Sequence, residues 1–345
     1  MQNRIKKFFL LILLLQFFYS CSDKKQLTPA EKLDKFFRKS EVTIAATDSG
    51  LGGLSIMADA IERMREAKVF QKVNFVFFNA LFSNERGYNS LRIREEKIQI
   101  FDSALKSLEN NFHPDLILIG CNTLSTVYDD TSFSQEIRIP VVGIIEAGVE
   151  LIAQNLKASP YSKVIIFATQ TTISEDTHKK KLEEKGIHSE RIILQACPEL
   201  ANYIEKGFDS DETEMLISAY VDEALQTVQN IQLPLYVSFN CTHYGYSLDL
   251  WKEAFTNNSL EPLAFLDPNS NMSDFLFESK RRNRFKSTGI SSQVVSMVQI
   301  SQERIDSIGK LLKGISPQTE EALFNYELKE NLFEWRKYLT PERYF

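Results

Sequence analysis

The chain has 345 residues, of which 43% are hydrophobic and 25% are charged. That balance is typical of globular proteins with a hydrophobic core, and it excludes collagen-like and disordered chains. The formal net charge of −6 disfavours a general nucleic-acid-binding protein, whose surface is normally basic. Four cysteines are too few for a disulfide-stapled scaffold, and four histidines leave little room for a histidine-rich metal site.

The first twenty residues differ in composition from the rest of the chain. Residues 1–7 carry three basic side chains and no acidic one, and residues 8–19 are almost wholly apolar. A basic segment followed by a short apolar run and a small residue is typical of a secretory signal peptide. The apolar run is too short to cross a bilayer, which needs about 20 residues. Ser20 and Cys21 follow it, and this junction resembles the cleavage site of bacterial lipoproteins.

We therefore predict a signal peptide over residues 1–20 and a lipid on Cys21. The lipid would anchor the protein to a membrane of the bacterial cell envelope, facing the periplasm or the cell surface. The alternative is a cytoplasmic protein that buries this segment as its first helix. Residues 21–40 are charged and lack a long apolar run, so we expect a tether or a short surface helix there. Without the signal, 37 basic and 46 acidic side chains remain, a formal charge of −9.

The body of the chain alternates short apolar runs with longer amphipathic ones. Alternation of this kind predicts βαβ units with parallel sheets and helices on both faces, and two successive runs predict two α/β domains. Helices are expected over residues 54–67 and 91–109, among others. The predicted strands are 42–47, 74–79, 115–120 and 140–145 in the first run and 163–169, 191–196, 235–239 and 263–266 in the second.

The C-terminal part is expected to be helical. Helices are predicted over residues 271–280 and 298–313, with one or two more within 317–338, so that residues 315–345 form a helical extension. Residues 280–284 include four basic side chains. This run is either a solvated face or, in an anchored protein, a contact with anionic lipid headgroups.

Small polar clusters follow four of the predicted strands at similar spacings. Asp48 and Cys121 are 73 positions apart, and Thr169 and Cys241 are 72 apart, which indicates one α/β plan used twice. Ligands of parallel sheets bind beyond the carboxyl ends of the strands. If the two halves face each other, each presents one cysteine to a shared cleft. The clusters are Asp48-Ser49-Gly50, Cys121-Asn122-Thr123, Thr169-Gln170-Thr171-Thr172 and Cys241-Thr242-His243.

Two cysteines placed in this way have three chemical interpretations. They could form a disulfide, belong to a metal site, or act as two acid/base groups. A metal needs more ligands, and only His243 stands near either cysteine in the sequence. Two opposed thiols suit proton transfer, because a thiolate on one face of a carbon can remove a proton while the thiol on the other face returns one. This exchange inverts a stereocentre, and His243 would take part in moving the proton.

Three blocks of the sequence resemble the cofactor-independent aspartate/glutamate racemases. Weaker resemblance runs in the same order through residues 143–148, Cys197-Pro198 with Glu205, Asp267-Pro268 and residues 285–289, so that it covers roughly residues 42–314. The three main blocks are Asp48-Ser49-Gly50-Leu51-Gly52-Gly53-Leu54, Cys121-Asn122-Thr123 and Cys241-Thr242-His243-Tyr244.

The resemblance implies an architecture and an activity. It implies two similar α/β domains with the active site in the cleft between them, the first formed by residues 41–146 and 263–314 and the second by residues 147–262. It implies a racemase that inverts glutamate or a related acidic amino acid without pyridoxal phosphate, metal or other cofactor. Its partner would be that small-molecule substrate rather than nucleic acid, besides the membrane reached through the lipid, and a homodimer is compatible with it.

The resemblance also implies roles for single residues. Cys121 would deprotonate the D-enantiomer and Cys241 the L-enantiomer, assisted by Asp48 and His243 respectively, with Glu205 near the site. The substrate's ammonium and carboxylate groups would be held by Ser49, Asn122, Thr123 and Thr242, with support from Thr169 and Thr172.

The sequence departs from the family in the loop after its second strand and in its predicted signal peptide. Asn79 stands where the family has an aspartate, and Asn84-Glu85-Arg86-Gly87-Tyr88 replaces a Pro-Tyr-Gly loop that shapes the side-chain end of the pocket. The identity of the acidic substrate therefore stays open. An alternative function is a lipoprotein that binds an amino acid or related carboxylate without turnover, and a Cys121–Cys241 disulfide acting as a redox switch is a third reading.

Overall fold

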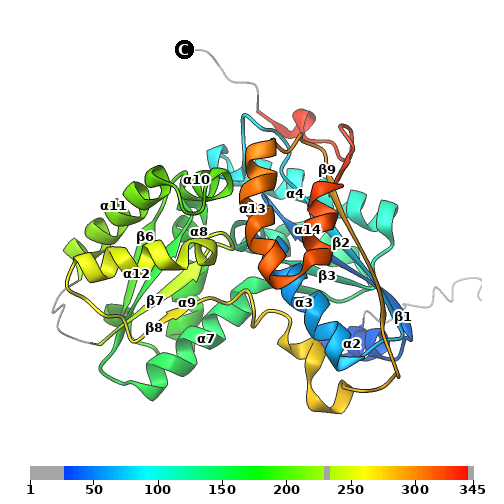
Figure 1. Ribbon diagram of the computed structural model, residues 1–345, viewed down its shortest axis with the longest axis horizontal. Helices are drawn as coiled ribbons and strands as arrows, with labels where there is room; N and C mark the ends of the chain where they lie inside the picture. The colour runs from blue at the N-terminus through cyan, green and yellow to red at the C-terminus, as the bar shows by residue number, and fades with distance from the viewer. Residues whose placement is uncertain (1–26, 229–233, 341–345) are drawn as a thin grey trace, which may run out of the picture.

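The computed structural model describes residues 27–228 and 234–340, and these form two α/β domains that lie side by side (Figure 1). The first domain contains a six-stranded sheet of order β10-β9-β2-β1-β3-β4, and the second a four-stranded sheet of order β6-β5-β7-β8. All neighbouring strands pair in parallel. The predicted fold class, α/β with two parallel-sheet domains, is confirmed.

The first sheet has a hydrophobic core on each face. Along β1, Val42, Ile44 and Ala46 contribute to one core, whereas Ala45 points to the other. This alternation follows from the two-residue repeat of a strand and explains why the run is apolar throughout. The strands are β1 (Glu41–Asp48), β2 (Lys72–Asn79), β3 (Leu116–Ile119), β4 (Val141–Gly143), β9 (Gly289–Ser296) and β10 (Glu327–Leu328). The principal helices are α3 (Leu54–Ala67), α4 (Arg94–Phe112), α13 (Gln302–Ile315) and α14 (Pro317–Phe324), with short helices α5 (Asn122–Ser125) and α6 (Ser132–Glu136).

The second sheet follows the same plan. Ile165 and Phe167 of β5 pack on one face, and Val164 and Ile166 on the other. The strands are β5 (Lys163–Ala168), β6 (Ile192–Ala196), β7 (Leu235–Asn240) and β8 (Ala264–Leu266). The helices are α7 (Ile144–Ala158), α8 (Gln170–Glu175), α9 (Thr177–Glu184), α10 (Leu200–Lys206), α11 (Asp211–Thr227) and α12 (Leu248–Asn257).

Strand register brings the four polar clusters to two neighbouring sheet edges. In the first sheet, Thr47 lies opposite Ile119, so that Asp48 and the Cys121 turn follow adjacent strands. In the second sheet, Ala168 lies opposite Asn240, which sets Thr169 beside Cys241. Each domain therefore presents two clusters at the carboxyl end of its central strands, as the sequence spacing predicted.

The chain returns to the first sheet after β8, and here the structure corrects several expectations. Residues 264–266 pair with β7 of the second sheet, as expected from the second run of predicted strands, whereas the family resemblance placed residues 263–314 in the first domain. Strand β9, which was not predicted, pairs along its whole length with β2. Four of its eight residues, in the sequence Gly-Ile-Ser-Ser-Gln-Val-Val-Ser, are polar, and its first five residues are exposed or only partly buried. It therefore lacks the continuous apolar run by which the other strands were predicted.

The C-terminal helices are shorter than expected. The predicted helix over residues 271–280 is replaced by two 3₁₀ turns, Asp274–Phe277 and Ser279–Arg281, and the helix expected from residue 298 begins at Gln302. The expected helical extension is helical only in α14 and a 3₁₀ turn at Arg336–Tyr338. Between these, β10 joins the first sheet and Phe333 reaches the core beside Phe78, 5.9 Å between ring centroids. Burying these apolar side chains outweighs helix propensity.

Residues 29–37 form a helix, α2 (Pro29–Phe37), that packs on the first domain. Thr28 caps it through a reciprocal capping box with Glu31. Phe36 is buried, and its ring lies 5.1 Å from that of Phe70, in the connection between α3 and β2. A tether or a short surface helix was expected over residues 21–40. The described part of this segment is a helix docked on the first domain, because Phe36 and Phe37 bury apolar surface.

The predicted signal peptide over residues 1–20 and the lipid site at Cys21 lie outside the described residues. Within residues 27–228 and 234–340, none of the helices has the length and apolar character needed to cross a membrane.

Replacing Phe36 by alanine tests the docking of α2. Because Phe36 is buried against Phe70, Phe36→Ala is expected to destabilise the protein by about 3–5 kcal/mol, measured as a lower urea midpoint of unfolding. The matched control is Lys35→Ala on the exposed side of the same helix, which is expected to leave the midpoint within error. Equal midpoints for Phe36→Ala and the wild type would show that α2 does not dock.

Candidate active site

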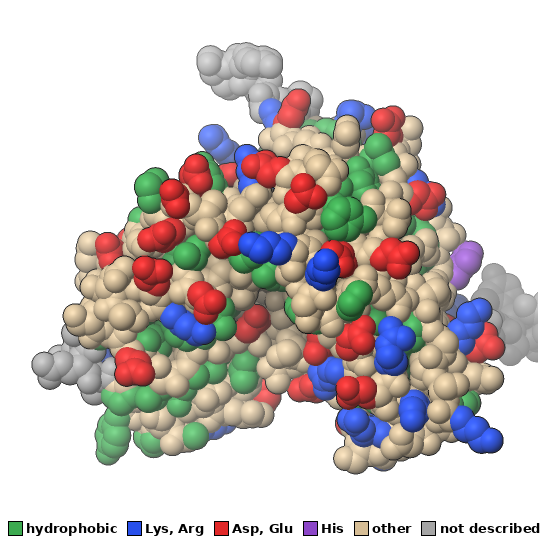
Figure 2. Space-filling view, in the orientation of Figure 1, with side chains coloured by type: hydrophobic (Ala, Val, Ile, Leu, Met, Phe, Trp, Pro, Cys, Tyr) green, Lys and Arg blue, Asp and Glu red, His purple; other side chains and the backbone are tan. Residues whose placement is uncertain are grey.

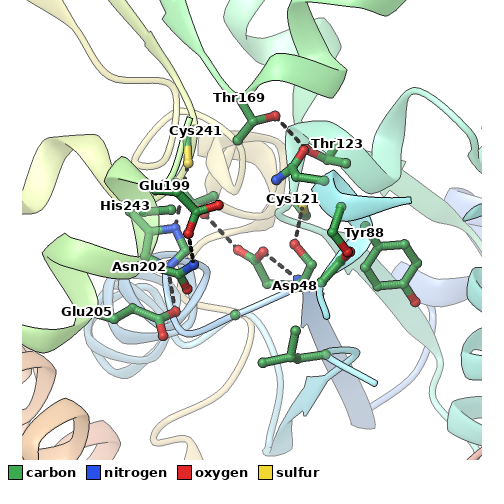
Figure 3. Close-up of a pocket in the computed structure, with 18 of the residues that line it drawn as sticks. Asp48, Tyr88, Cys121, Thr123, Thr169, Glu199, Asn202, Glu205, Cys241 and His243 are labelled. Atoms are coloured by element: carbon green, nitrogen blue, oxygen red, sulfur yellow. Dashed lines mark hydrogen bonds and ion pairs between the residues drawn. The ribbon is translucent and has the colours of Figure 1, made fainter. Parts of the chain in front are cut away.

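A cavity of about 340 Å³ lies between the two domains, at the carboxyl ends of both central strands. Figure 3 shows side chains from the two domains converging on it, with Asp48 and Cys121 on one side and Cys241 and His243 on the other. It is bordered by nearly all the residues predicted for the site: Asp48, Ser49, Cys121, Asn122, Thr123, Thr169, Glu205, Cys241, Thr242 and His243. Thr172 adjoins the cavity through hydrogen bonds to two of these residues.

The first domain contributes a buried carboxylate and a thiol. Asp48 ends β1, and its two oxygens accept hydrogen bonds from the backbone N–H of Ser49 (2.6 Å) and the hydroxyl of Thr242 (2.8 Å). The bond from Thr242 crosses between the domains. Cys121 caps α5, and its Sγ lies 3.1 Å from the Ser49 hydroxyl. The strand end, the glycine-rich turn and the start of α5 thus hold the acid and the thiol in fixed positions.

Burial governs protonation in this half of the site. The pKa of Asp48 is raised by loss of solvent, although the His243 charge and the Thr242 hydroxyl oppose this rise. The pKa of the Cys121 thiol is raised well above its usual range, first by burial and then by the Asp48 carboxylate. Cys121 is therefore a thiol in the ligand-free protein, poised to give a proton rather than to take one.

The second domain contributes a thiol, a histidine and a carboxylate in line. Cys241 follows β7, and its Sγ lies 3.6 Å from Nδ1 of His243. Nε2 of the same ring lies 2.7 Å from Oε1 of Glu205, a residue of α10. That oxygen also accepts a hydrogen bond of 2.6 Å from the backbone N–H of Leu51 in the first domain. The line therefore ends on the glycine-rich turn of the other domain.

Hydrogen bonding outweighs burial in this second half. Burial lowers the pKa of His243, but its hydrogen bonds to Cys241 and Glu205 raise that pKa well above the usual value. For Glu205, burial raises the pKa, but the bond to His243 and the charges of His243 and Arg304 bring it below its usual value. His243 is thus an imidazolium held against a carboxylate, next to the Cys241 sulfur.

Hydroxyl and amide groups complete the wall between the thiols. The hydroxyls of Thr123, Thr169 and Thr172 form a buried cluster, with 2.8 Å between Thr123 and Thr169, and it joins the two domains. The side-chain amide of Asn122 is buried, and its nitrogen and oxygen have no hydrogen-bond partner among the described residues. A buried amide of this kind is available to a ligand, because its hydrogen bonds are otherwise unmade.

The glycine-rich turn allows the two domains to approach closely. A Cβ on Gly52 would lie 2.3 Å from the Thr242 hydroxyl and 2.7 Å from Nδ1 of His243. Any side chain there would push the histidine turn away from Asp48. This close approach is the physical reason for glycine at position 52.

Several residues that border the cavity were not among the predicted site residues, and four of them carry polar side chains of interest here. Tyr88 belongs to the loop after β2, where the sequence departs from the family pattern. Glu199, with a positive φ of 61°, and Asn202 lie around the start of α10, and Arg304 comes from α13. A lone arginine on an amphipathic helix carries no sequence signal, because only the fold brings it to Glu205.

A third cysteine among the described residues, Cys197, also lies near the two predicted catalytic thiols. Cys197 borders the cavity and also belongs to the second domain's hydrophobic core. Cys121, Cys197 and Cys241 are all free thiols. In the part of the chain that the structure describes, no group of three or more histidine, cysteine, aspartate or glutamate side chains is arranged to hold a metal ion.

Comparisons with known proteins include several glutamate racemases. The chain is similar to glutamate racemase of Clostridium botulinum, with 29% identity over 208 residues that span 60% of this chain and 73% of the relative. It is 25% identical to glutamate racemase 3 of Caldanaerobacter subterraneus over 272 residues, which span 79% of this chain and 91% of that protein.

Solved structures agree on the fold. The crystal structure of glutamate racemase from Francisella tularensis in complex with D-glutamate matches with a TM-score of 0.60 and 22% identity, over 80% of this chain and 95% of that one. Glutamate racemase from Aquifex pyrophilus matches with a TM-score of 0.55 and 24% identity, over 79% and 96% of the two chains. The two-domain architecture is therefore that of known glutamate racemases.

The sequence model of the Asp/Glu/hydantoin racemase family matches residues 54–233, which is just over half of the 345 residues. The expected family resemblance is thus confirmed by sequence relatives and by fold. The chain belongs to the Asp/Glu/hydantoin racemase family and is an isomerase of that class.

Proposed function

We propose that this amino-acid racemase interconverts L- and D-glutamate, or a closely related acidic amino acid, by proton transfer between two thiols. The observation that carries the proposal is the pair Cys121 and Cys241, which border one cavity from opposite domains. Each thiol has its own partner, the Ser49 hydroxyl and the His243 ring respectively. The glutamate racemases among its relatives support the choice of substrate class.

The proposed reaction balances within the site. For the L-enantiomer, the Cys241 thiolate takes the Cα proton and becomes a thiol, while the electron pair of the broken C–H bond spreads into the α-carboxylate. The Cys121 thiol then gives its proton to the opposite face of Cα and becomes a thiolate. The D-enantiomer reacts by the reverse route. One proton enters and one leaves Cα, so no further reactant is needed.

The polar groups between the thiols suit the proposed intermediate. Negative charge grows on the α-carboxylate as the Cα proton leaves, and fixed hydrogen-bond donors stabilise such charge without reorganising. The buried threonine hydroxyls and the unpartnered Asn122 amide are donors of this kind. Ser49 and Thr242 would hold the ammonium and carboxylate groups from either side, next to Asp48.

An exchange assay in deuterated buffer tests whether the protein turns over. With its thiols reduced, it is expected to convert either enantiomer of glutamate into the racemate, with deuterium appearing at Cα by mass spectrometry. A panel containing aspartate and other amino acids identifies the substrate, since Glu85 and Tyr88 replace the usual loop at the cavity. Tight binding without deuterium at any Cα would instead identify a binding protein.

Replacing each thiol tests the two-base chemistry. Cys121→Ala and Cys241→Ala are each expected to lower kcat about 10²- to 10⁴-fold, because each removes an acid/base group, while calorimetry still detects binding of glutamate. Cys197→Ala is the matched control, since Cys197 packs in the core of the second domain, and its kcat should stay within a few-fold of wild type. Wild-type rates in either of the first two variants would exclude a thiol role.

We further propose that a lipid on Cys21 anchors the enzyme in the cell envelope. Thr28 lies seven positions after Cys21, so a fully extended chain spans at most about 25 Å from Cys21 to the start of α2. The basic run lies beside that helix, since the Arg281 guanidinium sits 3.4 Å from the ring centroid of Phe37. Figure 2 shows basic side chains gathered on this part of the first domain, at the lower right. Such a surface suits anionic headgroups.

Fractionation of cells that express the full chain tests the anchor. The wild type is expected in the membrane fraction and to incorporate labelled fatty acid, whereas Cys21→Ser should lose the label. Cys197→Ser is the control for loss of a cysteine elsewhere, because Cys197 is buried. A wild-type protein that is soluble and unlabelled would contradict the proposal.

A further inference from the structure

Arg304 connects the C-terminal return of the chain to the histidine of the second domain. It lies on α13, which packs on both α3 of the first domain and α10 of the second, and its guanidinium contacts α10 at the border of the cavity. Nη1 donates to Oε2 of Glu205 at 2.9 Å, and Nη2 lies 3.5 Å from Oδ1 of Asn202. The side chains of Arg304 and Glu205 are 18% and 4% exposed, so this ion pair is largely shielded from water.

Both oxygens of Glu205 are therefore occupied by different partners. Oε1 serves His243 and the Leu51 backbone, while Oε2 serves Arg304. Four ionisable groups follow one another from the sulfur outward: Cys241, His243, Glu205 and Arg304. With the thiol ionised, their formal charges alternate and sum to zero. Arg304 is also the one lysine or arginine among the described residues bordering the cavity.

We propose that Arg304 is a positioning residue that balances the Glu205 carboxylate and thereby stabilises Cys241 as the thiolate that acts on the L-enantiomer. This inference rests on the two-thiol reaction proposed above and adds a residue to it. Because Arg304 and Glu205 belong to different domains, the balance exists only while the domains are together.

The charges around the site explain why a fourth group is needed. His243 faces two carboxylates, Glu205 from α10 and Asp48 from β1, which lies close enough to act on it electrostatically. Cys121 across the cavity, and Cys197 and Tyr244 on the second domain, are neutral as thiols and phenol. Without Arg304, an ionised Cys241 would make a third negative charge against one imidazolium in a buried site. Protonation of the Cys241 sulfur would remove this excess negative charge, so without Arg304 the thiolate would form only at higher pH.

The chain offers a matched control on the same helix. Lys310 also lies on α13 and also forms an ion pair with the second domain, at 2.8 Å from Oδ2 of Asp209. Those two side chains are 67% and 57% exposed and lie outside the line of groups that ends at Cys241. Lys310→Met therefore removes a contact between the domains while the Arg304 charge that pairs with Glu205 stays in place.

The experiment measures the pH dependence of alkylation of Cys241 by iodoacetamide in the full chain, resolved by peptide mass spectrometry. For Arg304→Ala, the midpoint of the alkylation profile is expected to rise by at least one pH unit, a tenfold loss of thiolate on the acidic side. kcat/KM should fall by about tenfold or more in both directions alike, because the equilibrium constant of a racemisation is one. Added guanidinium ions and Arg304→Lys should each move the midpoint back towards the wild type.

Three results would overturn the proposal: an unchanged alkylation midpoint in Arg304→Ala, the same shift in Lys310→Met, or no recovery with either guanidinium or lysine. If Arg304→Ala does not fold, the midpoint of Arg304→Lys against that of Lys310→Met decides the matter, with an intermediate upward shift expected for the lysine variant alone. The alkylation profile does not depend on turnover. A wild-type protein without racemase activity would therefore refute the proposed function and still leave the effect of Arg304 measurable.

Discussion

The buried carboxylate of Glu205 is the constraint around which the rest of the site is arranged. One oxygen accepts from the Leu51 backbone of the first domain at 2.6 Å and contacts His243 at 2.7 Å, and the other binds Arg304 at 2.9 Å. A buried charge is tolerated only when such partners surround it. Because two partners come from the first domain and one from the second, the packing of the domains and the protonation of His243 are governed by the same contacts.

The two halves of the site share a plan but differ in chemistry. On one side, burial and the Asp48 carboxylate raise the pKa of the Cys121 thiol, although the hydrogen bond with the Ser49 hydroxyl opposes this rise. On the other, the Sγ of Cys241 lies 3.6 Å from Nδ1 of His243, whose pKa is raised by its hydrogen bonds to Cys241 and Glu205. A racemase needs one base and one acid at a time. The two thiols of the proposed reaction therefore stand in different surroundings.

Much of this arrangement could be predicted from the sequence, because parallel strands collect at one edge the residues that follow them. The positions of Asp48, Cys121, Thr169 and Cys241 are of this kind. Features that depend on contacts between distant segments could not be predicted. Arg304 meets Glu205 across 99 positions, and strand β9 is hidden by its half-polar sequence. The docking of α2 through Phe36 was likewise invisible, since its short apolar stretch resembles any surface helix.

The central claim is that thiols from two domains act on opposite faces of one carbon. The most direct test is the location of the isotope when L-glutamate is converted in deuterated buffer and sampled at low conversion. Two separate acid/base groups predict deuterium in nearly all of the D-glutamate formed and little in the remaining L-glutamate. A single group that removes and returns the proton would contradict the account, because it would carry the substrate's own hydrogen into the product or label both enantiomers alike.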